Sequence, residues 1–317
     1  MRWCGETKGE DGGGGRDGET VREGPPRPRK VNDMTNVKRV AVQGEVGSNS
    51  DMAVQQMLPG ATLVPCESFA AAFDAVHARR ADLALIPVEN STAGRVADPH
   101  HLLPDAGLHI VGEHFLPIHF DLVALPQARI EDIKTVRSHV HAFGQCTRLL
   151  RQFPWKRHIS ADTAGAAREV SELGDPTMAA LAPSGVAKIY GLQTLRGNVE
   201  DTSTNATRFV LLSPTEQITS QHPAITTLLF RVRNVPAALY KCLGGFATNS
   251  VNITKLESYQ LGGTFMASQF YVDIDGHIED KNVQLAVEEL RFFVTYLNIL
   301  GCYPAHPFRQ KVHPEEE

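Results

Sequence analysis

Short apolar runs alternate with segments of helical periodicity between residues 37 and 213. The apolar runs are typical of buried strands, and they lie at 37–44 (VKRVAVQG), 61–65, 82–89 (DLALIPVE), 133–139 and 178–183. Apolar residues recur every three to four positions at 68–81, 141–153, 162–173 and 184–191, which predicts helices. Ser68 is suited to cap the first of these helices, and Asp162 or Thr163 the third. Strands separated by helices predict parallel pairing through crossovers, and therefore an α/β fold.

The pattern changes after residue 223. Strand, helix, strand, strand, helix and strand are predicted in turn at 224–232, 236–249, 252–260, 264–276, 282–297 and 298–304. This β-α-β-β-α-β order is that of the ferredoxin-like split unit. The polar, proline-bounded segment 214–223 is predicted to link the two modules, and residues 305–317 to form a C-terminal tail.

The first 36 residues contain a glycine run and a proline cluster but almost nothing to bury. Such a segment cannot offset the entropy cost of ordering, so we expect a disordered tail at residues 1–36. Met34, just before the first predicted strand, is a second candidate translation start.

Composition narrows the classes of function. A net charge of −5 provides no basic surface for nucleic acid. No run approaches the roughly 18 apolar residues of a membrane span, and no signal peptide is evident, so a cytoplasmic protein is expected. The five cysteines lack Cys-x-x-Cys spacing, and the histidine clusters at 99–102 and 138–143 lack the spacing of metal sites. We therefore expect no catalytic metal.

Polar clusters occur at four strand ends of the first module, where α/β proteins place their ligand sites. They are QGEVGSNS (43–50), IPVENSTAGRV (86–96), SHVHAFGQC (138–146) and NATRFVLL (205–212). The candidate site residues in them are Ser48, Asn49, Glu89, Asn90, Ser138, Gln145, Asn205, Thr207 and Arg208.

Each cluster also has a plain structural interpretation. Glycine and serine are common in turns, and Glu89 is either a helix cap or a functional acid whose pKa partial burial would raise. Histidines at the start of a helix, such as His139 and His141, more often face solvent than act as bases. The shared position of the clusters at strand ends favours a site.

These motifs, with AKIYGLQTL (187–195) and NVEDTSTNATRFVLL (198–212), resemble the prephenate dehydratase family in order and approximate spacing. The C-terminal module resembles an ACT regulatory domain, so the resemblance covers residues 37–304. It implies a catalytic domain at 37–213, with two α/β lobes resembling type 2 periplasmic-binding folds and a site between them. A ferredoxin-like ACT domain at 224–304 would follow.

The resemblance implies conversion of prephenate to phenylpyruvate without a cofactor. The departing ring hydroxyl gains negative charge in the transition state, so donors aimed at that oxygen are the central need. Thr207 matches the family's essential threonine and is expected to donate, with Glu89 as the proton reservoir. Asn90, Ser138 and Gln145 would orient the substrate, and Asn205 is a further candidate contact.

Substrate carboxylates need their own partners. The backbone at Ser48 and Asn49 would offer helix-start donors to one carboxylate, and Arg208 is suited to bidentate pairing. A structural ion pair of Arg208 with Glu200 or Asp201 is the alternative.

The resemblance also implies regulation by phenylalanine, bound between paired ACT domains of a homodimer or homotetramer. The expected effector-site residues are Ala237, Ala238, Leu239, Asn252, Glu257 and Ser258. Ala237 replaces a usual glycine, and Tyr259 and Gln260 replace a usual Arg-Pro pair, so phenylalanine binding is in question. Two other functions stay open: arogenate dehydratase activity, and a non-enzymatic amino-acid sensor built on the same fold.

Overall fold

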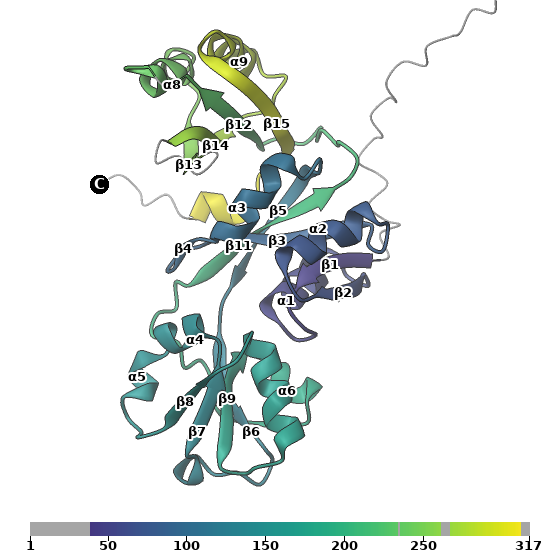
Figure 1. Cartoon of the computed structure of the whole chain (residues 1–317), viewed down its shortest axis with the longest axis vertical. Coiled ribbons are helices and arrows are strands. Elements are labelled where there is room, and N and C mark those ends of the chain that lie inside the picture. The colour runs from purple at the N-terminus through teal and green to yellow at the C-terminus, as the bar shows by residue number, and fades with distance from the viewer. Residues whose placement is uncertain (1–38, 234, 261–266, 312–317) are drawn as a thin grey trace, which may run out of the picture.

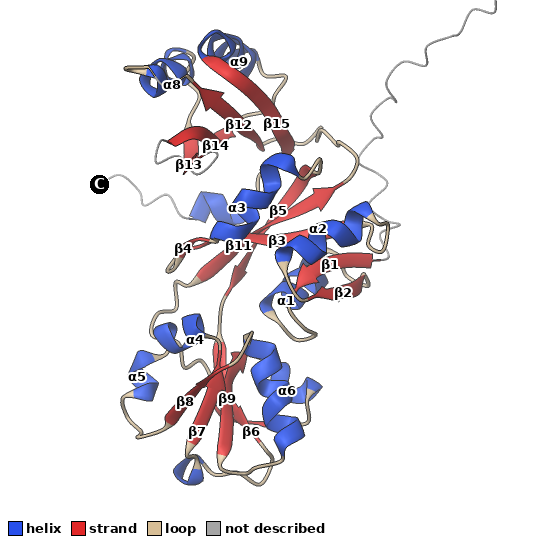
Figure 2. Ribbon diagram, in the orientation of Figure 1, coloured by secondary structure: helices blue, strands red, loops and turns tan. Residues whose placement is uncertain are grey.

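The computed structural model describes residues 39–233, 235–260 and 267–311, so the N-terminal tail expected at residues 1–36 lies outside the described residues. Figure 1 shows three units along the long axis of the molecule: a middle lobe (lobe I), a second lobe below it (lobe II) and a C-terminal domain above it. Figure 2 shows a sheet flanked by helices in each unit. The predicted α/β catalytic module with two lobes and a separate C-terminal domain is confirmed.

Lobe I is built on a sheet of order β2-β1-β3-β11-β5, with β4 paired to β3. Its strands are β1 (Arg39–Gln43), β2 (Thr62–Cys66), β3 (Leu83–Asn90), β4 (Gly94–Arg95), β5 (His109–Pro117) and β11 (Ala206–Ser213); its helices are α1 (Asn49–Met57), α2 (Phe69–His77) and α3 (Ala97–Leu102). β1 pairs in parallel with β2 and β3, whereas β11 is antiparallel to β3 and β5. The sheet is therefore mixed and not purely parallel as the crossover pattern predicted.

Lobe II has a mixed sheet of order β10-β6-β9-β7-β8. Its strands are β6 (Phe120–Ala124), β7 (Thr135–Ser138), β8 (Lys156–Ile159), β9 (Met178–Pro183) and β10 (Gln193–Arg196); its helices are α4 (Val140–Gln145), α5 (Thr147–Leu150), α6 (Thr163–Leu173) and α7 (Val186–Ile189). The predicted Asp162 cap is confirmed, because its carboxylate accepts a hydrogen bond from the Gly165 backbone at 2.7 Å. The prediction of a single helix at 141–153 is wrong. Two short helices, α4 and α5, are separated at Cys146, whose backbone is not helical.

The C-terminal domain is an antiparallel sheet of order β13-β14-β12-β15. Its elements are β12 (Ala224–Val232), α8 (Ala238–Thr248), β13 (Ile253–Gln260), β14 (Ala267–Asp275), α9 (Lys281–Phe293) and β15 (Val294–Pro304). The predicted β-α-β-β-α-β order is confirmed, but the helix expected at 282–297 ends at Phe293. Residues 294–297 instead extend β15 along β12, where the β-branched Val294 and Thr295 suit a strand.

The chain crosses between the lobes twice. It enters lobe II after Pro117 and returns through residues 197–205 into β11. The two crossings are tied together, since the Ile118 backbone N–H donates to the Asn205 carbonyl at 2.9 Å and the His119 imidazole lies 2.7 Å from the Glu200 carboxylate. Strands β5 and β6, which flank the first crossing, were not predicted: their 109–124 segment shows no clean alternation, and β5 pairs with a strand nearly 100 residues away.

The C-terminal domain packs directly onto lobe I. Ile225, Tyr271 and Leu300 share one buried apolar cluster with lobe I residues such as Ile86 and Val210. The segment expected as a C-terminal tail adds to this interface, because the Phe308 ring stacks on Phe115 in β5 with centroids 5.0 Å apart. At Gly301 the backbones approach so closely that a Cβ would lie 2.0 Å from the Ile110 carbonyl oxygen, so only glycine fits there. The contact is thus a packed interface.

Candidate active site

A cleft of about 730 Å³ lies between lobes I and II. Lobe I contributes the end of β3, the start of α1, the β4 turn and β11, and lobe II contributes the starts of α4 and α6. Five of the residues predicted for the site line this cleft: Ser48, Asn49, Asn90, Gln145 and Thr207. The four polar clusters at strand ends therefore converge on one space.

Strand register decides which of the predicted residues can face the cleft. β3 and β11 pair antiparallel, with Thr207 opposite Asn90 and Arg208 opposite Glu89. Neighbouring residues of a strand point to opposite faces of the sheet. Thr207 and Asn90 line the cleft, so Arg208 and Glu89 point to the other face, where the C-terminal domain packs.

A chain of side-chain amides runs from lobe II to Thr207. The Asn205 amide nitrogen donates to the Gln145 side-chain oxygen at 2.9 Å, and the Asn205 oxygen accepts from Asn90 Nδ2 at 2.8 Å. Asn90 Nδ2 also donates to Thr207 Oγ1 at 3.0 Å. The Asn90 side-chain oxygen accepts from the backbone N–H groups of Thr92 and Ala93, which fixes its amide orientation.

The hydrogen-bond network from Gln145 to Thr207 leaves two donors free to bind a ligand. Asn90 Nδ2 has two hydrogens, and its shortest contacts are to the Asn205 and Thr207 side-chain oxygens, with the Ala206 carbonyl farther away at 3.3 Å, so Thr207 Oγ1 is an acceptor from Asn90. Within the described part of the chain, neither the Thr207 hydroxyl hydrogen nor the Gln145 amide nitrogen is committed to a protein acceptor. Both groups line the cleft as donors.

The start of α1 forms another wall. Ser48 caps this helix by accepting from the Asp51 backbone N–H at 3.3 Å. The Asn49 side-chain oxygen is buried and has no hydrogen-bond partner among the described residues. A buried polar atom without a partner is rare in folded proteins, and here it borders the cleft, so it is suited to a ligand.

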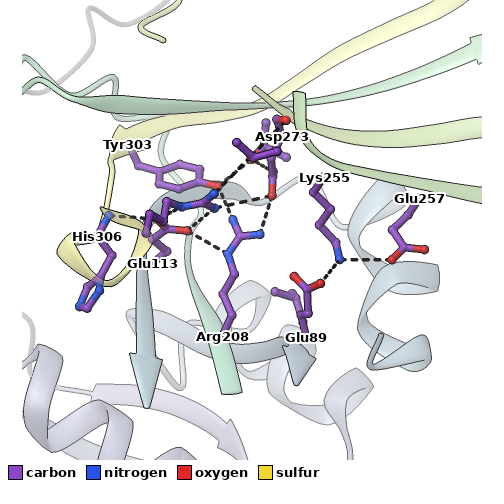
Figure 3. A network of polar contacts seen from close by, with 12 residues as sticks. Glu89, Glu113, Arg208, Lys255, Glu257, Asp273, Tyr303 and His306 are labelled. Atoms are coloured by element: carbon purple, nitrogen blue, oxygen red, sulfur yellow. Dashed lines mark hydrogen bonds and ion pairs between the residues drawn. The ribbon is translucent and has the colours of Figure 1, made fainter. Parts of the chain in front are cut away.

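Glu89 does not fulfil its expected role as a proton reservoir for the cleft. Its carboxylate accepts from Lys255 Nζ in β13 at 3.0 Å (Figure 3). The strand register places this carboxylate on the face of the sheet opposite Thr207. The adjacent position in sequence suggested proximity to Asn90, but the two-residue period of a strand separates the side chains.

Arg208 is likewise placed away from the cleft. Its buried guanidinium pairs with Glu113 of β5 and Asp273 of β14 and donates to the Tyr303 hydroxyl at 3.0 Å (Figure 3). These partners are not Glu200 or Asp201, the alternatives expected from sequence. Arg208 is thus an interface residue rather than a carboxylate-binding residue of the site.

Two further predicted residues act behind the cleft wall. Ser138 is fully buried, and its hydroxyl donates to the Leu181 carbonyl at 2.6 Å, so it fastens β7 to β9 and does not line the cleft. His139 caps α4. Asn205 is buried and reaches the site only through its bonds to Asn90 and Gln145, which makes it a positioning residue.

The cleft also contains residues that sequence patterns did not single out as site residues. His139 and His141 line it with ring centroids 4.8 Å apart; His141 is exposed, as expected of a histidine at a helix start, and His139 is half-buried. Burial lowers the pKa of His139, and the neighbouring His141 lowers it further. Arg95, in the β4 turn after Asn90, lines the cleft as well. Arg95 lies in the same polar cluster as Glu89 and Asn90, and this nearness in sequence was the signal that could have indicated it.

A second pocket, of about 540 Å³, lies in the C-terminal domain. Four of the predicted effector residues line it: Ala237, Ala238, Leu239 and Ser258. Glu257 and Asn252 do not. Glu257 instead pairs with Lys255 at 3.2 Å, and the Asn252 amide donates to Asp275 at 2.7 Å. Tyr259 is buried against His100 of lobe I, so this replacement affects the domain interface rather than the pocket.

The described residues include no group of three or more His, Cys, Asp and Glu side chains arranged to hold a metal ion. Nor does this part of the chain contain a helix long and apolar enough to cross a membrane.

Comparisons with known proteins agree with this geometry. The family model described as prephenate dehydratase matches residues 40–217. A bifunctional N-acyl-homoserine lactone acylase/prephenate dehydratase of Komagataeibacter europaeus is 45% identical over 88% of this chain and all of its own length. Arogenate dehydratase/prephenate dehydratase 1 of Arabidopsis thaliana is 36% identical over 84% of this chain and 72% of its own.

The crystal structure of an Arthrobacter aurescens prephenate dehydratase in complex with L-Phe superposes with a TM-score of 0.77. It is 30% identical and covers 84% of this chain and 90% of its own. The sequence match spans the cleft-lining strands, and the structural match extends into the C-terminal domain. The chain belongs to the prephenate dehydratase family.

Proposed function

We propose that the cleft converts prephenate to phenylpyruvate, with the Thr207 hydroxyl donating to the departing ring oxygen. The observation that carries this proposal is the amide chain from Gln145 to Thr207, which leaves the Thr207 proton directed to a ligand. In the reaction, the bond between the ring and its hydroxyl breaks with its electron pair on oxygen. The bond to the ring carboxylate supplies the pair that completes the aromatic ring, and carbon dioxide leaves.

Thr207 stabilises the charge that develops on the leaving oxygen. Its hydrogen bond is fixed in advance because Asn90 donates to Thr207 Oγ1, and such preorganised donors act mainly in the transition state. Donation by Asn90 also makes the Thr207 hydroxyl a better donor, since successive hydrogen bonds polarise one another. One proton is consumed as water forms. The exposed His141 imidazole lines the cleft and is suited to supply this proton, whereas the lowered pKa of His139 leaves that ring largely uncharged at neutral pH.

The remaining groups in the cleft orient the substrate. Backbone N–H groups at the start of α1 favour binding of an anion, and we assign the pyruvyl carboxylate of prephenate to this position. The Asn49 side chain and the Gln145 amide nitrogen supply neutral hydrogen bonds. Phe120 and Phe209 line the same space and offer apolar contact to the ring.

The direct test incubates the purified full-length protein with prephenate at neutral pH and follows phenylpyruvate. We expect turnover without added metal or cofactor. A parallel incubation with arogenate, followed as phenylalanine, separates the two substrates of the family. If the chain binds prephenate or phenylalanine but forms neither product, the sensor function is favoured and the enzyme proposal is wrong.

Phenylalanine binding at the second pocket is the regulatory part of the proposal. Ala237 has a left-handed backbone with φ of 60° and lines this pocket, where its methyl group limits how closely a ligand can approach. Ala237→Gly is therefore expected to lower the phenylalanine concentration that half-inhibits turnover. The same change at the exposed Ala247 of α8 is the control, and an unchanged midpoint in Ala237→Gly would remove this residue from the effector site.

We also propose that the C-terminal domain mediates a homodimer or homotetramer. Phe292 is 82% exposed on α9, and Phe293, Tyr296 and Tyr240 are exposed on the same domain. Aromatic side chains are enriched at subunit contacts, so these exposed rings support an interface on this domain. Sedimentation with and without phenylalanine measures the assembly.

A further inference from the structure

The two lobes also touch away from the chain crossings. The turn between β1 and α1 in lobe I contacts α6 and the end of α7 in lobe II, and Figure 1 shows α1 and α6 on the same side of the crossings. Arg168 of α6 makes a bidentate contact with the Glu45 carboxylate, with Nε 2.7 Å from one oxygen and Nη2 2.9 Å from the other. The Tyr190 hydroxyl donates to the Val46 carbonyl at 2.8 Å. These four residues form an interlobe latch.

The backbone at this latch is shaped for close contact between the lobes. Gly47 has a φ of 84°, and a Cβ there would lie 2.9 Å from the Val186 and Ile189 side chains of α7. At Gly165 of α6, a Cβ would lie 3.3 Å from a Glu45 carboxylate oxygen. A side chain at Gly47 would be both strained and too close to α7, so glycine is required there. The turn and lobe II are thus complementary in shape as well as in charge.

The latch lies next to two walls of the cleft. Gly44 and Ser48, on either side of the turn, line the cleft, and Ser48 caps α1, where a substrate carboxylate is assigned above. On lobe II, Asp162 lines the cleft at the start of the helix that carries Arg168. The contact between Glu45 and Arg168 therefore sets the separation of the two walls.

The strength of the latch is suited to reversible closure. Glu45 and Arg168 are 34% and 38% exposed, so water screens the pair, and Arg168 also contacts Glu172 of its own helix at 2.9 Å. Bidentate charged pairs are strong among hydrogen bonds, but a pair this exposed contributes only modestly. Two lobes joined by two connections are arranged for hinge closure around a ligand. A modest contribution shifts such an equilibrium without preventing opening.

We propose that the Glu45–Arg168 pair holds the cleft closed around its ligand, and that ligand exchange requires the pair to separate. Arg168 does not line the cleft, so it is a positioning residue that acts through Glu45 on the start of α1. Loss of the pair lowers the closed fraction, which raises the apparent Kd in proportion and leaves the chemical step of the closed state unchanged. This kinetic consequence rests on the proposed dehydratase function, whereas closure itself does not.

Glu45→Gln and Arg168→Gln test the proposal by kinetics. Each is expected to raise KM for prephenate about three- to tenfold, with kcat changed less than about twofold. The double variant should be no worse than either single variant, because both remove the same pair. Arg168→Lys keeps the charge and should recover part of the loss. Glu172→Gln is the matched control, because it removes the other carboxylate partner of Arg168 and leaves the latch in place.

Hydrogen–deuterium exchange of the ligand-free full-length protein measures closure without turnover. We expect exchange at residues 44–50 and 161–167 to be faster in Glu45→Gln than in wild-type protein, and unchanged in Glu172→Gln. Unchanged exchange in Glu45→Gln, or an unchanged KM in an active enzyme, overturns the proposal. If the wild-type protein forms no product, the dehydratase function fails, and the exchange rates alone decide whether the latch holds the lobes together.

Discussion

Thr207→Ala is expected to lower kcat for prephenate about 10²- to 10³-fold, the usual effect of removing one preorganised donor to a developing oxyanion. The reason lies in the donor count. Asn90 commits its second hydrogen to Thr207 Oγ1, so the threonine hydrogen is the one this arrangement directs at the leaving oxygen. Initial rates with saturating prephenate measure the loss, and KM should change much less because the contact forms mainly in the transition state.

Two further variants make this prediction specific. Thr207→Ser keeps the hydroxyl and should keep most of the rate, whereas Asn205→Ala should lower kcat although Asn205 does not line the cleft, because it breaks the link between Asn90 and Gln145. Thermal unfolding and circular dichroism confirm that each variant is folded. Equal kcat for wild-type protein and Thr207→Ala would exclude the threonine from the chemistry.

Local motifs identified several residues that line the cleft, because each cluster lies at one end of a strand. Asn90 is the last residue of β3, Thr207 is near the start of β11 and Gln145 is the last residue of the short helix after β7, and the fold brings these positions together. Caps such as Ser68 and Asp162 were also predictable, since an N-cap depends on three or four neighbouring residues.

Side-chain direction was less predictable. Glu89 and Arg208 are each adjacent in sequence to a cleft residue, yet both lie on the opposite face of the sheet. The C-terminal domain packs on that face and pairs with both side chains. No local sequence pattern indicates a contact of this kind. Arg95 was missed for the complementary reason: it follows a turn, and its environment is set by β13, about 160 residues later in the chain.

The buried ion pairs of Arg208, between lobe I and the C-terminal domain, account for the largest expected change in the free energy of unfolding. Arg208→Ala should lower the free energy of unfolding by about 3–5 kcal/mol, because it leaves buried charges without their partner. Both carboxylates, Glu113 and Asp273, are fully buried, and Arg309 is the cation that remains near them. Arg39→Ala is the matched control: its pair with Asp82 is about 40% exposed on both sides, and loss of such a pair costs about 0–1 kcal/mol.

The pH dependence of this loss identifies its cause. Burial acts to raise the pKa of Asp273, but Arg208 and Thr227 outweigh burial and hold the pKa below its ordinary value of 3.8. A lowered carboxyl pKa contributes stability that is present above the ordinary value and is lost as pH falls through the folded value. Without Arg208, burial prevails and Asp273 takes up its proton at higher pH, which neutralises the unpaired charge. Urea unfolding at pH 7 and at pH 4 should therefore show the difference between wild-type protein and Arg208→Ala narrowing as pH falls, whereas a loss caused only by missing packing would be the same at both.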